Sequence, residues 1–247
     1  MNVLLIGTDT LHRRFIINSL LDNGVNLKTC IFQTISYKAT FRTNPLWAKF
    51  EKTELLKRFN KKTRLDLRRV KKIIKIKSLS SITNECKKEI SKSDFVIVSG
   101  ADLIKGQLLE MLRLKALNVH MGIAEKYRGL DSNLWAWYHQ DYKSIGVTLH
   151  KLNSDLDTGQ IFKSQSIKIN KKTKIWLLRY FESDLAVKLL KMALNCYKKK
   201  KLILRKQKKI GRYYSFMPTV IKNKMHYNAI SNFIIGIYLL DYFIKII

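Results

Sequence analysis

The chain has 247 residues, 46% of them hydrophobic, which is enough for one sizeable hydrophobic core with a small C-terminal appendage. Its three cysteines are far apart and show no C-x-x-C spacing, so the sequence predicts neither a disulfide framework nor a zinc site, and a reducing, cytoplasmic location is expected. The net charge of +30 allows three interpretations: nucleic-acid binding, attraction of an anionic small substrate, or a basic bias of the whole composition. Lysines occur in nearly every segment, so the bias is favoured and no specific nucleic-acid partner is expected.

The first third of the chain alternates continuous apolar runs with amphipathic stretches. Strands are expected at 2–7, 25–32, 73–76 and 94–99, and helices at 11–21 and 82–90. The first of these begins without a basic lead-in and is interpreted as a buried strand, not a signal peptide. Fully apolar runs such as 95–98 are typical of parallel strands buried on both faces. The sequence therefore predicts an α/β fold with a mostly parallel sheet, and a connecting helix and loop at 42–69.

The turn after the first strand reads Gly-Thr-Asp-Thr over residues 7–10 and lacks the G-x-G-x-x-G pattern, so nicotinamide or flavin binding is not expected there. Open α/β sheets bind ligands at the carboxyl ends of their strands, which makes Thr10, His12 and Arg13 candidate ligand contacts. The alternative is that Thr10 only caps the following helix.

The middle and last thirds continue the pattern. A strand is expected at 117–120, a helix at 129–139, strands at 145–152 and 161–169 joined by a polar turn, and a long amphipathic helix at 176–197. We expect a core domain at 1–200 and a C-terminal extension at 201–247. The end of that extension, 230–247, is too apolar to lie exposed, and we interpret it as the interface of a homodimer. An interfacial membrane helix is the alternative, although charged residues interrupt the run and no spanning helix is predicted.

Three polar residues of the middle third carry the chemistry. Asn118 and His120 are two positions apart on a strand, so their side chains project to the same face. Asp157 lies in a glycine-terminated loop between two strands. An amide that stabilises an oxyanion, an imidazole that moves a proton and a carboxylate that orients it suit acyl transfer to an amine, without a metal. On spacing alone, a lone histidine at a strand end is more often structural.

Four motifs in order, N-V-H at 118–120, Y-R-G at 127–129, G-V-T at 146–148 and D-T-G at 157–159, resemble the signature of the folate-dependent formyltransferases. The resemblance covers 94–169 clearly and the first 34 residues loosely. One departure is the loop after the histidine, which reads M-G-I-A-E at 121–125 where many members have two prolines.

The resemblance implies a Rossmann-like core that binds N10-formyltetrahydrofolate between two turns. The residues implied for the folate are Gly100, Ala101, Asp102, Leu103, Ile104, Lys105, Asp155 and Leu156. It also implies that Asn118 donates a hydrogen bond to the oxyanion, that His120 assists and removes the amine proton, and that Asp157 sets the histidine and accepts or relays the proton.

Among the acceptors used in this family, the chain is most similar to enzymes acting on nucleotide-linked amino sugars, because the tyrosine-rich stretch 211–218 resembles theirs. Residues 198–247 leave no room for the barrel domain of the tRNA enzymes, and 8–12 differ from the phosphate loop of the glycinamide enzymes. A dTDP-linked 4-amino-4,6-dideoxyhexose for bacterial surface polysaccharide (O-antigen) is expected. The candidate acceptor contacts are Thr10, His12, Met121, Gly122, Lys126, Tyr127, Arg128 and Gly129. The alternatives are glycinamide ribonucleotide or methionyl-tRNA as acceptor, and a non-catalytic folate- or nucleic-acid-binding module.

Overall fold

The computed structural model describes residues 1–35, 38–66, 68–170 and 172–225. Its centre is a seven-stranded sheet in the order β3-β2-β1-β4-β5-β7-β8. The strands are β1 Val3–Gly7, β2 Leu27–Gln33, β3 Lys72–Ile76, β4 Phe95–Ser99, β5 Ala116–His120, β7 Gly146–His150 and β8 Ile161–Ser166. The first five are parallel, β7 is antiparallel to β5, and β8 is antiparallel to β7. The predicted mostly parallel α/β fold is confirmed.

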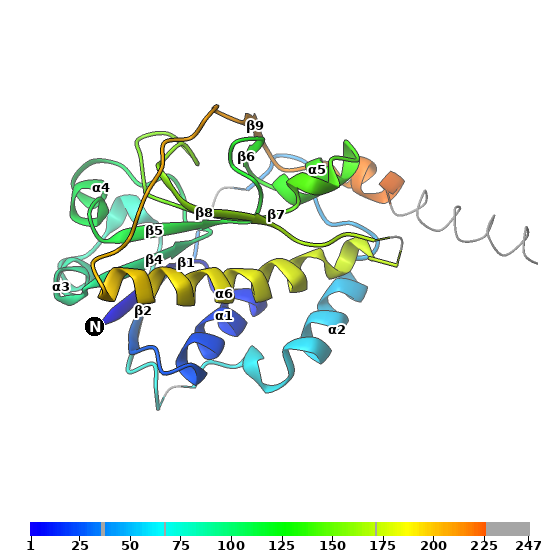
Figure 1. Cartoon of the computed structure of the whole chain (residues 1–247). Coiled ribbons are helices and arrows are strands. Elements are labelled where there is room, and N and C mark those ends of the chain that lie inside the picture. Colours follow the sequence, from blue (N-terminus) through cyan, green and yellow to red (C-terminus); the bar gives the residue numbers. More distant parts are fainter. Residues whose placement is uncertain (36–37, 67, 171, 226–247) are drawn as a thin grey trace, which may run out of the picture.

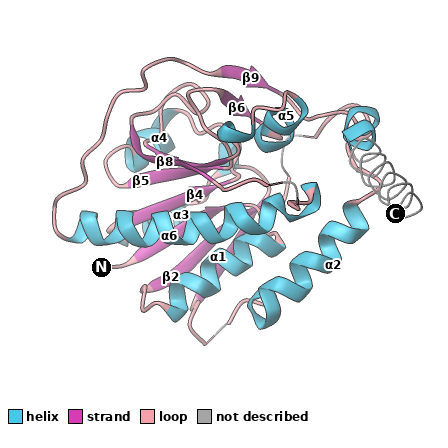
Figure 2. Cartoon of the chain, turned by 45° about the vertical axis from the view of Figure 1, so that its right-hand side comes forward, coloured by secondary structure: helices cyan, strands magenta, loops and turns pink. Residues whose placement is uncertain are grey.

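Helices cover both faces of the sheet (Figures 1 and 2). On one face lie α1 Leu11–Asp22 and the long α6 Leu178–Lys198, with α2 Ala48–Phe59 beside them; on the other lie α3 Asn84–Lys92 and α4 Gly106–Leu112. Alternate residues of β1 enter the two cores, since Val3 and Leu5 pack towards α1 and α6 whereas Leu4 and Ile6 pack towards α3 and α4. This two-sided burial is why the central strands are apolar throughout. Four short 3-10 helices complete the core: Asn60–Thr63, Leu79–Ser81, Tyr142–Ser144 and Ile175–Leu177.

A second, two-stranded sheet was not predicted. Residues Tyr127–Gly129 form β6, which pairs in parallel with β9, Arg212–Tyr214. As a consequence the helix expected at 129–139 begins only at Ser132 and ends at Tyr138, as α5. The seven-residue α4 was also not predicted, because only two of its residues, Leu108 and Leu112, are buried, too few to set a helical period.

The described part of the C-terminal extension, 201–225, lies against the core. Arg205 and Ile161 exchange two backbone hydrogen bonds of 2.8 and 2.9 Å, and the indole of Trp135 donates to the carbonyl of Ser215 at 2.9 Å. The buried ammonium of Lys222 lies 2.7 Å from a carboxylate oxygen of Asp131. We call residues 205–217 the strap, because they cross over the loops that follow β5 and β7 (Figure 1). The expected dimer interface at 230–247 lies outside the described residues.

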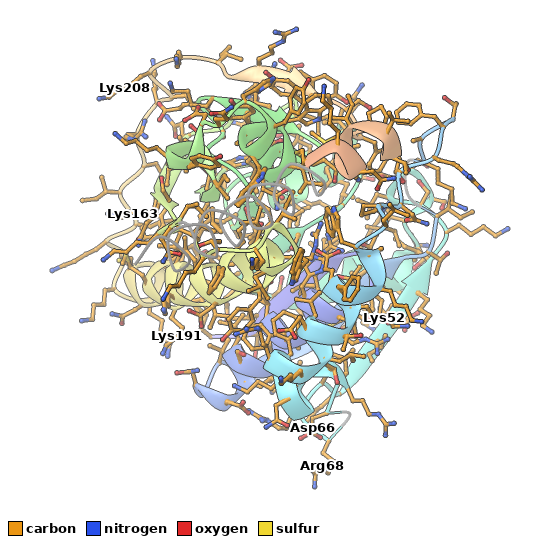
Figure 3. The ribbon with its side chains drawn as sticks, turned by 90° about the vertical axis from the view of Figure 1, so that its right-hand side faces the viewer. Lys52, Asp66, Arg68, Lys163, Lys191 and Lys208 are labelled. Atoms are coloured by element: carbon orange, nitrogen blue, oxygen red, sulfur yellow. The ribbon has the colours of Figure 1, made fainter. Side chains whose placement is uncertain are left out.

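The positive charge is distributed over the surface. Figure 3 shows Lys52, Lys163, Lys191 and Lys208 extending away from the ribbon on different elements. None of the helices in the described ranges is long and apolar enough to cross a membrane.

One acidic group of α6 is fully buried. Glu182 accepts a hydrogen bond from the Asn133 amide at 2.7 Å, and its other carboxyl oxygen has no hydrogen-bond partner within the described residues. Burial raises the pKa of Glu182 from its ordinary 4.5 to about 8. The folded protein therefore holds a proton on this carboxyl at neutral pH, where the unfolded chain has released it.

This shift predicts a pH-dependent stability. Between the two pKa values, 4.5 and about 8, the folded state binds more protons than the unfolded state, so the free energy of unfolding falls as pH rises through that window. Glu182→Gln should remove this fall, at about 1.4 kcal/mol per pKa unit, and become more stable than wild type above about pH 8. Urea unfolding at about pH 5.5 and about pH 8.5 measures it. The exposed Glu110→Gln is the control, and a wild-type pH slope in Glu182→Gln would contradict the interpretation.

Candidate active site

The topology brings the three predicted residues together with a fourth. Asn118 and His120 lie at the carboxyl end of β5, and the neighbouring β7 places His150 directly opposite Asn118. Asp157 reaches the same place from the turn between β7 and β8. The site is thus built where the antiparallel strand β7 joins the parallel part of the sheet (Figure 1).

The carboxylate of Asp157 is the centre of this cluster. One oxygen, Oδ2, accepts a hydrogen bond from the Gly129 amide at 2.8 Å and lies 3.2 Å from His120 Nδ1. The other, Oδ1, lies 3.2 Å from Asn118 Nδ2 and 3.2 Å from His150 Nε2. Asp157 is 8% exposed and His120 is 6% exposed, whereas Asn118 is only partly buried. Asn118 is therefore the member of the cluster that a ligand in the adjoining slot meets first.

The partners of the two imidazoles fix their protons. His120 Nε2 lies 2.8 Å from the carbonyl of Tyr127, which can only accept, and His120 Nδ1 faces the Asp157 carboxylate. Both contacts are hydrogen bonds only when His120 carries both ring protons. His150 Nδ1 donates to the carbonyl of Lys151 at 2.7 Å. Its Nε2 accepts from the Asn118 amide at 3.1 Å when the ring is neutral, and donates to Asp157 Oδ1 at 3.2 Å only when the ring carries both protons.

This surrounding keeps Asp157 ionised. Burial alone would raise its pKa, but the charge of His120, the hydrogen bond with His150 and the Gly129 amide together hold the pKa of Asp157 well below its ordinary value. The site thus contains a buried carboxylate 3.2 Å from the imidazole of His120, a pair of groups that can move a proton.

Two glycines allow this close packing. A side chain at Gly159 would place its Cβ 1.8 Å from the carbonyl of Lys151, and one at Gly122 would place it 2.8 Å from His120 Nε2. Asp157 itself has a left-handed backbone with φ of 56°, a conformation that costs a residue other than glycine of the order of 1 kcal/mol. The D-T-G motif is therefore a turn with a strained backbone at Asp157 and a close backbone contact at Gly159. This turn places the carboxylate in the cluster.

A slot adjoins the cluster between the two turns predicted to hold the folate. It is about 40 Å³ in volume and is lined by Asn118, His150 and both turns. Six of the eight residues expected to contact the folate line it: Ala101, Asp102, Leu103, Ile104, Asp155 and Leu156. Gly100 and Lys105 flank it and are exposed.

The lining of the slot has the chemical character that a flat bicyclic ring would contact, although its volume is too small for one. Val98, Ile104, Leu152 and Leu156 supply apolar walls, and the irregular backbone of 101–105 leaves amides and carbonyls beside it. At about 40 Å³ the slot holds only a water or two, so it must widen to admit a larger ligand. A wider hollow of about 680 Å³ lies at the amino ends of the parallel strands, lined among others by Met1, Asp94 and Leu114, and contains none of the site residues.

A cation lies at the carboxyl ends of β1 and β4. The guanidinium of Arg13 donates to the carbonyl of Thr8 at 3.2 Å and to the hydroxyls of Thr8, Thr10 and Ser99. Within the described residues it forms no ion pair with a carboxylate. Burial, with Arg179 nearby, lowers the pKa of Arg13 to about 9, so it stays charged at neutral pH but is stabilised by few anionic groups. An anionic ligand group would supply that stabilisation.

The predicted acceptor contacts of the β1–α1 loop adjoin Arg13. Thr10 is the N-cap residue of α1, as the capping alternative expected, but its hydroxyl lies 3.1 Å from His12 Nδ1 and makes no capping hydrogen bond. His12 is buried, and burial together with Arg13 lowers the pKa of His12 well below its ordinary value, so it is neutral.

The other predicted acceptor contacts occupy different surroundings. Tyr127 is buried and its ring stacks on His139 and Tyr214 at 5.8 and 5.3 Å, so its side chain supports the loop and its carbonyl receives His120. Arg128 donates to the carbonyls of Gly211 and Leu156 at 2.6 and 2.8 Å. Gly122 is buried, Met121 packs at the edge of the core, Gly129 binds Asp157 through its amide, and Lys126 is exposed.

One residue of the site was not predicted. This residue is His150, the last of the G-V-T-L-H stretch. Thr148 and His150 are two positions apart in an otherwise apolar strand, so they lie on the same face, and this spacing could have indicated a polar face. Arg13 was expected beside Thr10 and His12 in the loop after β1, and its guanidinium lies there.

The fold and the cluster define a Rossmann-like α/β protein with an amide, imidazole and carboxylate site at the carboxyl edge of its sheet. The sequence profile described as "Formyl transferase" matches residues 1–179, most of the chain, and the protein belongs to this family. A methionyl-tRNA formyltransferase of Prochlorococcus marinus (strain AS9601) is 28% identical over 176 residues, which cover 67% of this chain and 53% of the relative. The chain spans about half the length of the curated relatives it matches.

Solved structures share the fold. The formyltransferase PseJ of Anoxybacillus kamchatkensis, in complex with UDP-4,6-dideoxy-4-formamido-L-AltNAc and tetrahydrofolate, matches with a TM-score of 0.53 at 17% identity, over 87% of this chain and 86% of that one. The N-formyltransferase of Helicobacter canadensis, in complex with folinic acid and dTDP-3-aminofucose, matches with a TM-score of 0.54 at 18% identity, over 86% and 70%.

The place of Arg13 above Gly100 can be tested by stability. A Cβ at Gly100 would lie 1.5 Å from the Arg13 guanidinium, and Gly100 has φ of 58°. Gly106 has nearly the same backbone, φ of 57°, with open space around it. Gly106→Ala should cost about 1 kcal/mol through backbone strain, and Gly100→Ala about 1–2 kcal/mol more because Arg13 loses its hydrogen bonds. Urea unfolding measures both, and equal losses would show that Arg13 moves aside freely.

Proposed function

We propose that the protein transfers a formyl group from N10-formyltetrahydrofolate to the amine of a nucleotide-linked amino sugar, of the dTDP-4-amino-4,6-dideoxyhexose type, for bacterial surface polysaccharide. The observation that carries this proposal is the Asp157 carboxylate, which is saturated by His120, His150, Asn118 and Gly129 at the end of a slot whose lining suits a flat ring. We further propose that the protein acts in the cytoplasm as a homodimer.

The residues of the cluster divide the chemistry between them. The formylated folate supplies the one-carbon group. As the acceptor amine bonds to the formyl carbon and the bond from that carbon to the folate nitrogen breaks, negative charge on the formyl oxygen is stabilised by the Asn118 amide and the His120 imidazolium. Both amide protons of Asn118 are engaged with Asp157 and His150, so one of them must turn to that oxygen. The proton released by the amine passes to Asp157, directly or through His120, and the same groups return a proton to the folate nitrogen as it leaves.

The positive charge of Arg13 supports an acceptor that carries an anionic group. Arg13 is a cation without a carboxylate partner in the described part of the chain, at the edge of the sheet where α/β proteins bind ligands. A phosphate or pyrophosphate matches a guanidinium in charge and hydrogen-bonding geometry. We therefore propose that Arg13, with Thr10, binds the anionic group of the acceptor.

A second candidate acceptor is methionyl-tRNA. It is supported by the curated relatives, which are methionyl-tRNA formyltransferases at 28% identity and below. Both candidates place a phosphate near Arg13 and share the transfer chemistry, so only the acceptor separates them.

The reaction is tested by following tetrahydrofolate release with N10-formyltetrahydrofolate and a panel of dTDP- and UDP-linked amino sugars, glycinamide ribonucleotide and methionyl-tRNA. We expect turnover with an amino sugar, and a fall in kcat of at least about 1000-fold for Asp157→Asn and His120→Asn, because neither variant can hold the buried ion pair. Turnover of methionyl-tRNA alone would favour the second candidate. Wild-type turnover by His120→Asn would contradict the proposed chemistry.

The anion site has a matched pair of variants. Arg13→Gln should raise the KM for the acceptor roughly 10- to 100-fold and leave the KM for the folate unchanged, because a charged hydrogen bond is lost. The neighbouring Arg14, which pairs with Asp9 at 2.6 Å, gives the control Arg14→Gln, for which both constants should stay at wild-type values. Equal effects of the two variants would remove Arg13 from the acceptor site.

A further inference from the structure

The strap reaches the turn that carries Asp157 through one side chain. The amide nitrogen of Gln207 donates to the carbonyl of Asp157 at 2.7 Å and to the carbonyl of Gly159 at 3.0 Å. Carbonyls accept only, so the nitrogen of the amide must face them. Both protons of one amide therefore bridge the D-T-G turn from the outside, while the carboxylate of Asp157 is held from the inside.

The turn is strained and needs such a restraint. Asp157 has φ of 56°, and its neighbour Gly159 approaches the carbonyl of Lys151 closely. Residues in the left-handed region persist only where their surroundings over-determine them. On the other side of the turn, the residues at 153–155 are exposed, and two of them, Asn153 and Asp155, line the slot that must widen to admit a ring.

The strap itself is anchored without Gln207. Arg205 forms a two-pronged pair with Glu125 at 2.8 and 2.7 Å and exchanges two backbone hydrogen bonds with Ile161, and the Lys208 amide adds a bond to Glu125 at 2.6 Å. These contacts flank Gln207 on both sides. Its role in attaching the strap is therefore dispensable, whereas its contact with the turn has no substitute among the strap residues described.

A contribution to stability does not by itself explain the position of the Gln207 side chain. The amide oxygen of Gln207 is buried and has no hydrogen-bond partner in the described ranges. Such an orphan costs about 1–3 kcal/mol, which offsets what the two donated bonds contribute. A feature that is near neutral for stability but fixes the backbone of an active-site carboxylate is typical of a functional constraint.

We infer that Gln207 is a positioning residue for the transfer reaction, which holds the Asp157 turn so that its carboxylate stays on His120 and Gly129 while the slot widens. The expected effect of Gln207 on turnover rests on the proposed function, whereas its effect on the Asp157 turn does not.

The kinetic test compares three variants with a control. Gln207→Met and Gln207→Glu keep the length of the side chain and lose its donors, and they should lower kcat about 10- to 100-fold, the usual effect of removing a group that orients an active-site ligand. The KM values should change less than about three-fold. Gln207→Lys keeps a donor and should recover most of the rate. Lys206→Met, at the exposed neighbouring position, should behave as wild type.

The pH profile gives a readout that a merely structural role would not move. A displaced Asp157 loses the contacts that hold its pKa below the ordinary value, so the acidic limb of kcat/KM should move to higher pH in Gln207→Met. A rise in KM with unchanged kcat, or an unchanged acidic limb, would overturn the inference.

Hydrogen exchange separates this inference from the proposed function. The Gly129 amide, which donates to Asp157 Oδ2, should lose protection in Gln207→Met, whereas the Arg205 amide, bonded to Ile161, and the Leu130 amide, bonded to Tyr214, should keep theirs. Equal loss at all three would mean that Gln207 only attaches the strap and would overturn the inference. If the wild type formylates none of the acceptors, the proposed function fails, and the exchange pattern alone then decides the role of Gln207.

Discussion

The buried carboxylate of Asp157 is the constraint on which the site depends. A carboxylate that is 8% exposed is tolerated only if other groups replace the water it has lost. Here the replacements come from three separate segments: Asn118 and His120 on β5, His150 on β7, and the Gly129 amide at the end of β6. The switch from parallel to antiparallel pairing between β5 and β7 brings the first two segments together, and the strap holds the third. The groups that stabilise this one buried charge thus depend both on the topology of the sheet and on the C-terminal extension.

The same constraint explains the spacing of the motifs. In D-T-G, the aspartate must turn back into the sheet with a left-handed backbone, and the glycine must pass against the carbonyl of Lys151. In Y-R-G, the tyrosine contributes its carbonyl to His120, the arginine ties the loop to Gly211, and the glycine contributes its amide. Several of these motif residues act through their backbone. The identity of their side chains is therefore determined by packing and backbone conformation more than by contact with a substrate.

Much of the fold could be predicted because its central strands are buried on both faces. The run at 95–98 and the first strand have no other stable location, and their predicted ends are within a residue or two of those of β4 and β1. The pairing of β6 with β9 could not be predicted, because each strand has three residues and the partner is far away in the sequence. The cluster of Asn118, His120 and Asp157 was found through ordered motifs. His150 and Gln207 were missed because each depends on a partner from another segment, which periodicity does not reveal.

The departure of the loop at 121–125 from the family pattern is compensated by contacts of this chain. Two prolines that would stiffen the loop in many relatives are absent, but the buried hydroxyl of Thr148, from G-V-T, accepts from the Ala124 amide at 3.1 Å and donates to the carbonyl of Gly122 at 2.7 Å. Glu125 is fixed by Arg205 of the strap, whose hydrogen bonds lower the pKa of Glu125 to about 2, and Gly211 packs directly on the carbonyl of Ala124. A covalent restriction on the backbone is thus replaced by tertiary contacts, most of them from the strap. The rigidity of the loop after His120 therefore depends on residues beyond the core domain at 1–200, and that boundary does not divide the site from its support.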